Sequence, residues 1–514
     1  MPRSETTKTQ SASAERGYPT GPRLEGLDWI AAAGFTGVSM THKGGALMSW
    51  KSGLAGLVTM LVATPALAQS APIKAPTAEQ MAGMVDKGDT SWMLIASVLV
   101  LMMSVPGLAL FYGGLVRTKN MLSVLMQVLT IVAVASLVWV CWGYSLAFTS
   151  GTPFLGGLSK AFLAGVDGTT FAATFSNNVY IPEYAFVVFQ MTFACITPAL
   201  IVGAFAERVK FTPLILFVVA WLTLVYFPIA HMVWYWAGPD FLPDAPTDAG
   251  YLWSMGALDF AGGTVVHINA GIAGLVGALV IGPRLGYKKE PMAPHSLVMT
   301  MIGASLLWVG WFGFNAGSNL EANGVTGIAF INTYVATAAA AVAWAIIEQI
   351  VHGKPSLLGA VTGAVAGLVA ITPASGFAAP MTAIVLGFIA SFVCFFFVTT
   401  VKNMLGYDDS LDVFGVHCVG GIVGAIGTAI VADPALGGQG SIDYTVFPAV
   451  PGQYDMAGQL VTQLKAVGLT LVWSGLVSAV LFYALKLTMG MRPSQDVEHE
   501  GLDLAEHGER AYNH

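Results

Sequence analysis

The chain has 514 residues, of which 55% are hydrophobic and only 10% are charged, and its mean hydropathy is +0.70. Soluble domains carry about 25% charged residues, so this composition excludes a soluble globular protein and indicates a polytopic membrane protein. The formal net charge of -7 provides no basic surface of the kind that binds nucleic acid.

The first 68 residues predict an extension followed by a targeting segment. Residues 1–47 are polar and show no helical or strand periodicity. Residues 48–68 then combine a positive residue, Lys51, with a short apolar run and the small-residue sequence Ala66-Leu67-Ala68. This pattern is typical of a secretory signal peptide that is cleaved after Ala68.

The position of this signal peptide bears on where translation starts. Signal peptides begin at the initiating methionine, so we interpret Met48 (or Met40) as the true start and residues 1–47 as a disordered or mis-annotated extension. The alternative is a real extension that leads into an uncleaved membrane anchor. After cleavage, residues 69–90 would form an outer N-terminal segment.

Eleven apolar spans occupy most of the remaining chain, each close to the ~20 residues that a helix needs to cross a bilayer. They lie at residues 92–115, 121–147, 181–206, 211–233, 257–282, 294–316, 327–352, 355–373, 380–402, 411–431 and 462–488. The sequence therefore predicts an all-α membrane protein with eleven transmembrane helices. Its membrane domain covers residues 91–489, and a cytoplasmic tail covers residues 490–514.

The distribution of basic residues predicts the orientation of the chain. Every second loop is basic, whereas the loops between them hold almost no basic residue apart from Lys160 and, at a span edge, Lys465. The basic loops and the tail hold Arg117, Lys119, Arg208, Lys210, Arg284, Lys288, Lys289, Lys354, Lys402, Lys486 and Arg492. The positive-inside rule then places the N-terminus outside and the C-terminus in the cytoplasm. A cleaved signal peptide and an odd number of spans predict the same arrangement.

Two of the spans carry a histidine in the same local pattern. His267 and His417 are each followed by glycines at positions +4, +7 and +10, namely Gly271, Gly274, Gly277, Gly421, Gly424 and Gly427. Positions +4 and +7 lie on the same face of an α-helix as the histidine. Small residues allow close helix packing in membranes, so we expect these two helices to pack closely and to pair their imidazoles.

The spacing of the two histidine spans indicates an inverted repeat. They are the fifth and the tenth spans, and an offset of five spans reverses the direction of the second unit. Spans one to five and six to ten thus form an inverted 5+5 repeat, with span eleven as one additional helix. Such repeats place a substrate site at their interface near the bilayer midplane, so the architecture indicates a transporter or channel and not an enzyme.

Paired imidazoles inside a membrane favour a pathway for a polar permeant. Ionisable groups there are costly when charged, by estimates of ~2.5 to over 10 kcal/mol, and they usually mark such a route. Two neutral rings can share one proton, which leaves each an outward nitrogen for a small polar molecule. The alternative is a pair of structural histidines that are hydrogen-bonded to neighbouring helices. A metal site is less favoured, because no third ligand recurs nearby.

Other polar residues flank the histidine spans. Asp259 precedes the fifth span, where a carboxylate accepts hydrogen bonds from the free N–H groups of the helix and also favours cations in an outer vestibule. We expect Asp412 to begin the tenth span in the same way, with Asp408 and Asp409 just before it. We interpret His231, at the end of the fourth span, as a structural residue.

Long motifs along the chain resemble one known family. They are ALFYGGLVRTKN (109–120), FQMTFACITPALIVGAFAER (189–208), PIAHMVW (228–234), LDFAGGTVVHINAGIAGLVGA (258–278), WFGFNAGS (311–318), KPSLLGAVTGAVAGLVAITPASG (354–376) and DVFGVHCVGGIVG (412–424). These motifs closely resemble the ammonium transporter (Amt/Mep/Rh) family, in its bacterial Amt branch. The resemblance covers residues 90–514 in the expected order and includes the tail sequence EGLDLAEHGERAY (500–512).

The resemblance implies an outer recruitment site for ammonium. Its positions are matched by Trp234, Phe189, Phe193 and Ser318, with Asp259 behind them. Aromatic faces hold ammonium by cation–π attraction, worth ~0.5–2 kcal/mol as the ion loses water, and the serine hydroxyl accepts a hydrogen bond. The loop between Trp234 and Asp259 is long for the family, which leaves the shape of the outer vestibule open.

The resemblance also implies a gate and a pore. Phe193 and Phe314 match two stacked gate rings, and His267 and His417 match the paired histidines of a hydrophobic pore. NH4+ would bind outside, lose its proton near the gate and pass the histidines as NH3. Potassium neither donates directional hydrogen bonds nor loses a proton, so this route would exclude it.

The family implies further properties that the residues alone do not show. These are ammonium and ammonia as substrates, with methylammonium as an analogue, a location among the lipids of the inner membrane, a homotrimer, and a PII-type regulatory protein at the cytoplasmic face. The resemblance implies neither a cofactor nor a metal. Two alternatives stay open: an Rh-type gas channel, which Trp234 and Ser318 disfavour, and an ammonium sensor, which the short tail disfavours.

Overall fold

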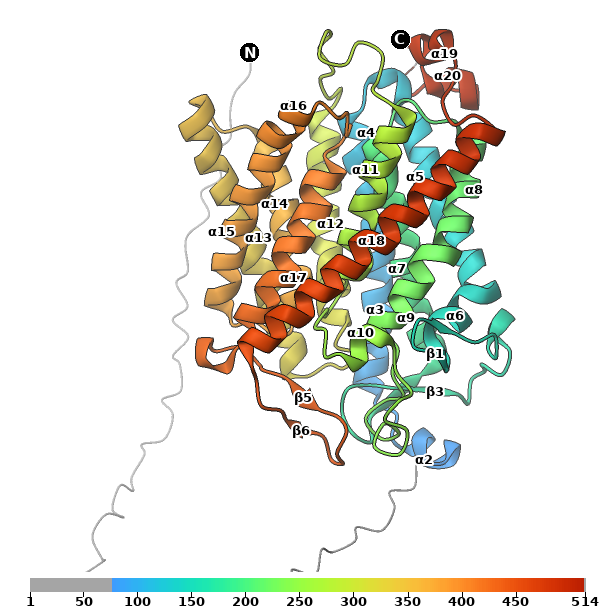
Figure 1. The fold of residues 1–514 in the computed structure, drawn as a ribbon, viewed down its shortest axis with the longest axis vertical. Coiled ribbons are helices and arrows are strands. Elements are labelled where there is room, and N and C mark those ends of the chain that lie inside the picture. Colours follow the sequence, from blue (N-terminus) through green and yellow to red (C-terminus); the bar gives the residue numbers. More distant parts are fainter. Residues whose placement is uncertain (1–75, 513–514) are drawn as a thin grey trace, which may run out of the picture. The chain divides into compact units, whose positions relative to one another are not determined.

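The computed structural model describes residues 76–512 of the chain. The predicted extension, the predicted signal peptide and the first residues of the outer segment lie outside the described residues. Within residues 76–512, eleven helices are long and apolar enough to cross a membrane, which confirms the predicted number of spans. These helices lie side by side in one bundle (Figure 1).

The first of the first five spans is kinked, and the second, fourth and fifth each contain a π-helical turn. The α-helices of these five spans are α3 (Lys87–Met102) and α4 (Ala109–Leu115), α5 (Met121–Val138) and α6 (Tyr144–Phe148), α7 (Glu183–Val202), α8 (Phe211–Trp221) and α9 (Phe227–Trp234), and α11 (Asn269–Ile281). The first span is kinked between α3 and α4, because Pro106 has no backbone N–H and the residue before it is extended. The fifth span begins at Gly263, later than the predicted start at residue 257, because the intervening residues form a turn around Asp259.

The next six spans are more regular. Their α-helices are α12 (Leu297–Gly317), α13 (Gly324–His352), α14 (Leu357–Ile371), α15 (Pro380–Phe396) with α16 (Lys402–Leu405), α17 (Val419–Val431) and α18 (Met456–Thr488). Side chains at Ser296, Asn323 and Ser356 each accept a hydrogen bond from a backbone N–H of the following first turn. Such N-caps explain why α12, α13 and α14 begin where they do.

Both histidines lie in a wide, π-helical turn at the start of their spans. His267 belongs to η7 (Gly263–Ile268), which continues into α11, and His417 belongs to η10 (Phe414–Cys418), which continues into α17. Single π-helical turns inside α-helices are often found at functional sites. The long helix α18 crosses the bundle obliquely and packs on α8, α11 and α17 (Figure 1).

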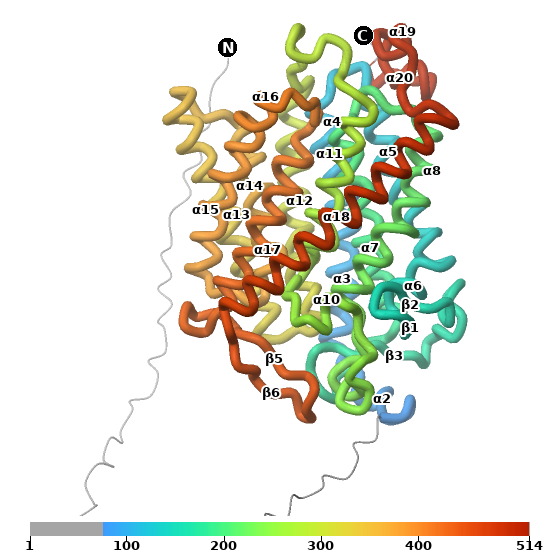
Figure 2. The backbone as a smooth tube through the Cα atoms, in the orientation of Figure 1, coloured from blue at the N-terminus to red at the C-terminus, as the bar shows by residue number. Residues whose placement is uncertain are grey.

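The two ends of the bundle differ (Figure 2). One end, which we call the tail face, carries the short C-terminal helices α19 (Gln495–Glu500) and α20 (Leu502–His507). The opposite end, which we call the vestibule face, carries loops with α2, α10 and three antiparallel strand pairs. These elements are α2 (Ala78–Gly83), α10 (Tyr251–Ser254), β1 (Gly151–Thr152) with β2 (Leu155–Gly156), β3 (Phe171–Ala173) with β4 (Tyr180–Pro182), and β5 (Ile442–Asp443) with β6 (Val450–Pro451).

Candidate functional site

A hollow of about 950 Å³ opens at the vestibule face. Its lining includes four of the predicted recruitment-site residues, Phe193, Trp234, Asp259 and Ser318. With Asp259, six carboxylate side chains line the hollow, and Lys160 is the one basic side chain among the described residues that line it. A concave site with an excess of negative charge attracts cations from solution.

Aromatic rings form the floor of this hollow. Phe193 and Phe314 stack with their ring centroids 4.2 Å apart, and Trp234 meets Phe193 edge-on at 5.7 Å. Both phenylalanine side chains are at most 1% exposed, so the rings close the hollow towards the middle of the bundle. Phe189 lies behind Phe193, edge-on at 5.0 Å, and it does not line the hollow.

Two hydrogen bonds orient the polar edge of the floor. The indole Nε1 of Trp234 donates to the backbone oxygen of Asp259 at 2.8 Å, which fixes the plane of the ring. The hydroxyl of Ser318 donates to the backbone oxygen of Phe314 at 2.9 Å. Because the hydroxyl proton is used in this bond, the Ser318 oxygen keeps its lone pairs as acceptors for a donor in the hollow.

Asp259 organises the turn that leads into the first histidine helix. Its carboxylate accepts hydrogen bonds from the backbone N–H groups of Gly262 (2.9 Å), Gly263 (2.6 Å), Thr264 (2.8 Å) and Val265 (3.2 Å), and from the Thr264 hydroxyl. Gly262 permits the backbone to turn around the carboxylate, because its φ of 115° lies in the left-handed region that favours glycine. Burial raises the pKa of Asp259 above its ordinary value, and the hydrogen bonds act in the opposite direction.

The prediction that Asp412 begins the tenth span is wrong. The carboxylate of Asp412 instead accepts a hydrogen bond from the Lys402 ammonium group at 2.6 Å. Asp409 takes the capping role and accepts backbone N–H groups from the first turn of the span at 3.0 and 2.7 Å. Asp409 lies eight residues before its histidine, as Asp259 does, and this shared spacing is the signal in the sequence that identifies the capping residue.

The two predicted pore histidines lie together between the halves of the bundle. The Nδ1 atoms of His267 and His417 are 3.3 Å apart, and their ring centroids are 5.4 Å apart with the planes at 19°. Both side chains are buried, at 1% and 5% exposure. A hydrogen bond between two Nδ1 atoms needs one ring to donate and the other to accept. The Nε2 of His267 has no hydrogen-bond partner within the described part of the chain.

Both rings face a small cavity below the aromatic floor. It has a volume of about 10 Å³ and is lined by His267, His417, Phe314, Trp311 and aliphatic or other apolar side chains. Trp311, for which the sequence predicts no role, stacks on His267 with ring centroids 5.4 Å apart. Its indole Nε1 donates to the Thr372 hydroxyl at 2.9 Å, so the ring that supports His267 is itself held in place. Its position three residues before Phe314, on one helix face, is the signal that could have identified it.

The long loop of residues 235–256 is attached to its neighbours by aromatic stacking. Trp236 stacks on Trp253 within the loop at 5.1 Å and on Phe175 of another loop at 5.9 Å. The loop therefore forms part of the wall of the hollow. His231 lies just before this loop. Its Nδ1 is 3.0 Å from the Ala147 backbone oxygen and its Nε2 is 2.8 Å from the Thr152 backbone oxygen, which agrees with its interpretation as structural.

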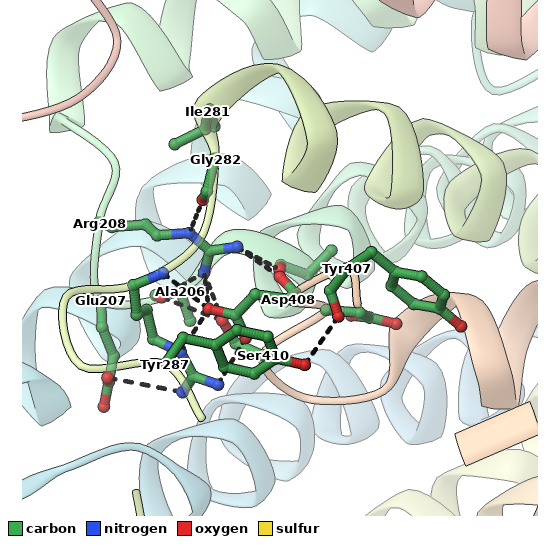
Figure 3. Close-up of polar contacts among 12 residues, drawn as sticks. Ala206, Glu207, Arg208, Ile281, Gly282, Tyr287, Tyr407, Asp408 and Ser410 are labelled. Atoms are coloured by element: carbon green, nitrogen blue, oxygen red, sulfur yellow. Dashed lines mark hydrogen bonds and ion pairs between the residues drawn. The ribbon is translucent and has the colours of Figure 1, made fainter. Parts of the chain in front are cut away.

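Buried charges join several loops at the tail face (Figure 3). Arg284 binds Asp408 with two side-chain nitrogens, at 3.0 and 2.8 Å, and lies 3.6 Å from Glu207. Arg208, which is fully buried, donates to the backbone oxygens of Gly282 at 2.6 Å and of Asp408. Burial lowers the pKa of Arg208 to about 10, although Asp408 acts in the opposite direction. The cluster ties the end of the third span to the loops around the fifth and tenth.

The C-terminal tail packs on this face. Glu498 accepts a hydrogen bond from the backbone N–H of Leu285 at 2.9 Å, and Asp503 accepts one from that of Ser123 at 2.8 Å. In return, Asn120 accepts a hydrogen bond from the N–H of Leu502 at 2.9 Å. Residues 490–512 contain no group of three or more His, Cys, Asp or Glu side chains that could hold a metal ion, and neither does the rest of the described chain.

This fold and this site define a channel-like membrane transporter and not an enzyme. A family model described as the Ammonium Transporter Family matches residues 91–512. The chain belongs to this family, and its function is the transport of ammonium.

Individual relatives cover most of the chain. The ammonium transporter of Bacillus subtilis is 44% identical over 429 residues, which are 83% of this chain and 98% of that protein. Ammonium transporter Amt1 of Archaeoglobus fulgidus is 39% identical over 83% of this chain and 99% of its own. Among solved structures, Saccharomyces cerevisiae Mep2 is similar with a TM-score of 0.71 and 32% identity, over 81% of this chain and 89% of that one. A sensor Amt protein is similar with a TM-score of 0.72 and 27% identity, over 84% and 99%.

Proposed function

We propose that the chain recruits NH4+ in the hollow at the vestibule face and conducts it past the paired histidines as neutral NH3. The recruitment site would comprise Trp234, Phe193 and Ser318, with Asp259 fixing the indole from behind and Phe189 supporting Phe193. The ring faces favour the cation, and the Ser318 oxygen accepts one of its N–H groups.

The loss of a proton is proposed to occur near Phe193 and Phe314. The cavity beyond these rings holds about 10 Å³, which is near the smallest volume that admits one water molecule. A hydrated cation does not fit there, and a bare one would cost at least several kcal/mol in so apolar a place. Neutral NH3 is small enough and carries no such cost. The same argument excludes K+, which has no proton to lose.

The observation that carries this proposal is the geometry of the two imidazoles. Their Nδ1–Nδ1 distance of 3.3 Å indicates one shared proton, and the Nε2 of His267 is buried without a partner among the described residues. Ammonia can both donate and accept hydrogen bonds, so it matches whichever tautomer presents its Nε2. A buried polar atom without a partner otherwise costs about 1–3 kcal/mol.

The test is the double variant His267→Ala/His417→Ala, measured by flux under voltage clamp with ammonium, methylammonium and potassium. We expect methylammonium uptake to fall by about tenfold or more, which corresponds to ~1.4 kcal/mol of lost stabilisation, and the exclusion of K+ to weaken. His352→Ala is the matched control, because this histidine is exposed at the end of α13. Unchanged uptake together with unchanged K+ exclusion in the double variant would contradict the pore role.

The arrangement in the membrane is part of the same proposal. The basic loops and the tail lie at one end of the bundle, so the tail face would be cytoplasmic and the vestibule face would be outside, in an inner membrane. A homotrimer and a PII-type regulator that contacts the tail face are proposed from the family resemblance. The docked tail supports the second point, since a partner that binds α19 or α20 would also reach the loops beneath them.

A further inference from the structure

Lys160 is unusual in its position. It lies in a loop of the vestibule face, where the sequence holds almost no basic residues, and it is the single basic side chain among the described residues that line the hollow. Its backbone N–H donates to the Ser145 hydroxyl at 3.0 Å, which attaches the loop to the first turn of α6. The side chain is 34% exposed, so it can leave its present place without unfolding the loop.

The partner of Lys160 is a buried carboxylate. Glu183, the first residue of α7, has a side chain only 2% exposed, and it accepts hydrogen bonds from the Lys160 ammonium group and from the Tyr144 hydroxyl, the latter at 2.6 Å. A carboxylate in such a place needs a cation beside it, because an unpaired buried charge is strongly destabilising. Lys160 supplies that cation from a partly exposed side chain in a loop.

A group of three aromatic rings lies next to this ion pair. The Lys160 nitrogen lies 5.9 Å from the centroid of the Tyr144 ring. Phe148 and Phe186 meet edge-on at 5.0 Å, and each contacts the Tyr144 ring, with centroids 6.3 and 6.5 Å away. All three aromatic residues line the hollow. A carboxylate combined with several ring faces is the chemistry that binds ammonium and alkylammonium ions.

The site is continuous with the proposed recruitment site. Glu183, Phe186, Gln190 and Phe193 recur at helical spacing on α7, and all of them line the hollow. Ten residues separate Glu183 from Phe193, which corresponds to ~15 Å along the helix axis. Between them, the side-chain oxygen of Gln190 is buried and has no hydrogen-bond partner in the described structure, so an acceptor is available part of the way along.

We propose that Glu183 and the rings of Tyr144, Phe148 and Phe186 form a second, outer binding site for ammonium and small primary alkylammonium ions, and that Lys160 is its tethered occupant. Free cations reach Glu183 by displacing the lysine. The tethered Lys160 ammonium group competes for Glu183 at an effective concentration in the millimolar range. Ammonium therefore occupies the site when its external concentration is high, and Lys160 occupies the site when that concentration is low. The inference rests on the proposed function only in taking ammonium as the cation that enters the hollow.

The test uses the purified full chain and its thermal unfolding in ammonium, methylammonium or sodium chloride. In Lys160→Met, Glu183 loses its partner, and ammonium is expected to take the place of the lysine. At a concentration of about one hundred times Kd this binding should raise Tm by roughly 3 °C. In Lys160→Met/Glu183→Gln this additional increment should be absent, because the variant has no carboxylate charge. In Lys160→Arg it should be smaller than in Lys160→Met, because a tethered cation still competes for Glu183.

The recruitment site is present in all of these variants, so differences between them report on Glu183 alone. A separate experiment tests the recruitment proposal: methylammonium uptake is measured in the variant Trp234→Leu. Unchanged uptake in this variant would contradict the recruitment site and would not bear on Glu183. An ammonium increment in Lys160→Met no larger than that of the double variant would overturn the second site. An increment that sodium reproduces would overturn its assignment to ammonium ions. A Lys160→Met protein that cannot be recovered even in ammonium would also overturn it, since the cation should restore what the lysine supplied.

Discussion

At the residue scale, two aspartates determine how the histidine helices begin. Asp259 and Asp409 each lie eight residues before a histidine, and each accepts backbone N–H groups from the turn that leads to it. The two sites are not identical. Asp259 is wrapped by a glycine-containing turn next to the hollow, whereas Asp409 lies at the tail face near Lys402 and Asp412. The electrostatic surroundings of the two caps therefore differ, although their spacing is the same.

Asp409 should make the stability of the protein depend on pH. Burial raises the pKa of Asp409 to about 7, with Asp412 adding to the rise and Lys402 opposing it. In the unfolded chain an aspartate titrates near ~3.9, so between these values the native state binds more protons than the unfolded state, and stability decreases as pH rises.

The measurement is the difference in Tm between the native protein and Asp409→Asn. We expect the native protein to lose stability relative to this variant between about pH 5 and about pH 8, by the equivalent of about 2–3 kcal/mol. The difference between the two proteins isolates Asp409, because all other groups titrate in both. Parallel Tm curves over this range would show that the pKa of Asp409 lies at its ordinary value.

At the scale of elements, reciprocal glycine contacts hold the histidine helices together. A Cβ atom at Gly271 would lie 2.4 Å from the backbone nitrogen of Cys418, the residue next to His417. A Cβ atom at Gly421 would lie 3.0 Å from the backbone oxygen of Gly263 and 3.2 Å from the Cβ of His267. Each helix thus uses the glycine at +4 to admit the histidine turn of the other, and this contact sets the distance between the imidazoles.

Gly271→Ala should therefore separate the two helices. We expect a destabilisation of roughly 1–3 kcal/mol, as for overpacking in a tight core, together with reduced ammonium transport because the imidazole pair is displaced. Gly468→Ala is the control: it lies within a membrane helix, but a Cβ atom there meets nothing within 4 Å. Thermal unfolding and methylammonium uptake of both variants would check this. Equal behaviour of the two would contradict a packing role for Gly271.

The sequence predicts the elements better than the details within them. Hydropathy identifies all eleven spans, because a helix that crosses a bilayer needs a long apolar run whatever its neighbours are. The start of the fifth span is misplaced, since apolar residues before Gly263 serve a turn and not a helix. The choice of Asp412 over Asp409 fails for a similar reason: nearness to the span is a weaker guide than spacing from the histidine. The contact of Trp311 with His267 depends on tertiary packing, which composition does not show.

At the scale of the whole molecule, the two repeats are joined at three levels. The histidine pair and its glycines connect them in the middle of the bundle. Helix α18, outside both repeats, packs on α11 and α17 and so bridges them on one side. The third connection is the buried charge cluster at the tail face, where Arg208 and Arg284 from the first half meet Asp408 from the second. This third connection also reaches the docked tail, because Leu285, next to Arg284, donates its N–H to Glu498.

Asp408→Asn should therefore weaken both the junction between the repeats and the docking of the tail. Burial raises the pKa of Asp408, but the hydrogen bonds from Arg284 and the charges of Arg284 and Arg208 outweigh it and hold the pKa below its ordinary value. Without the carboxylate charge, Arg208 and Arg284 are left buried and poorly compensated, which costs roughly 3–5 kcal/mol when one partner of a buried pair is removed. We expect a lower Tm and faster proteolysis within residues 490–512, with the exposed Asp496→Asn as the control. A tail as resistant as that of the control, with an unchanged Tm, would show that the repeats are held together without this cluster.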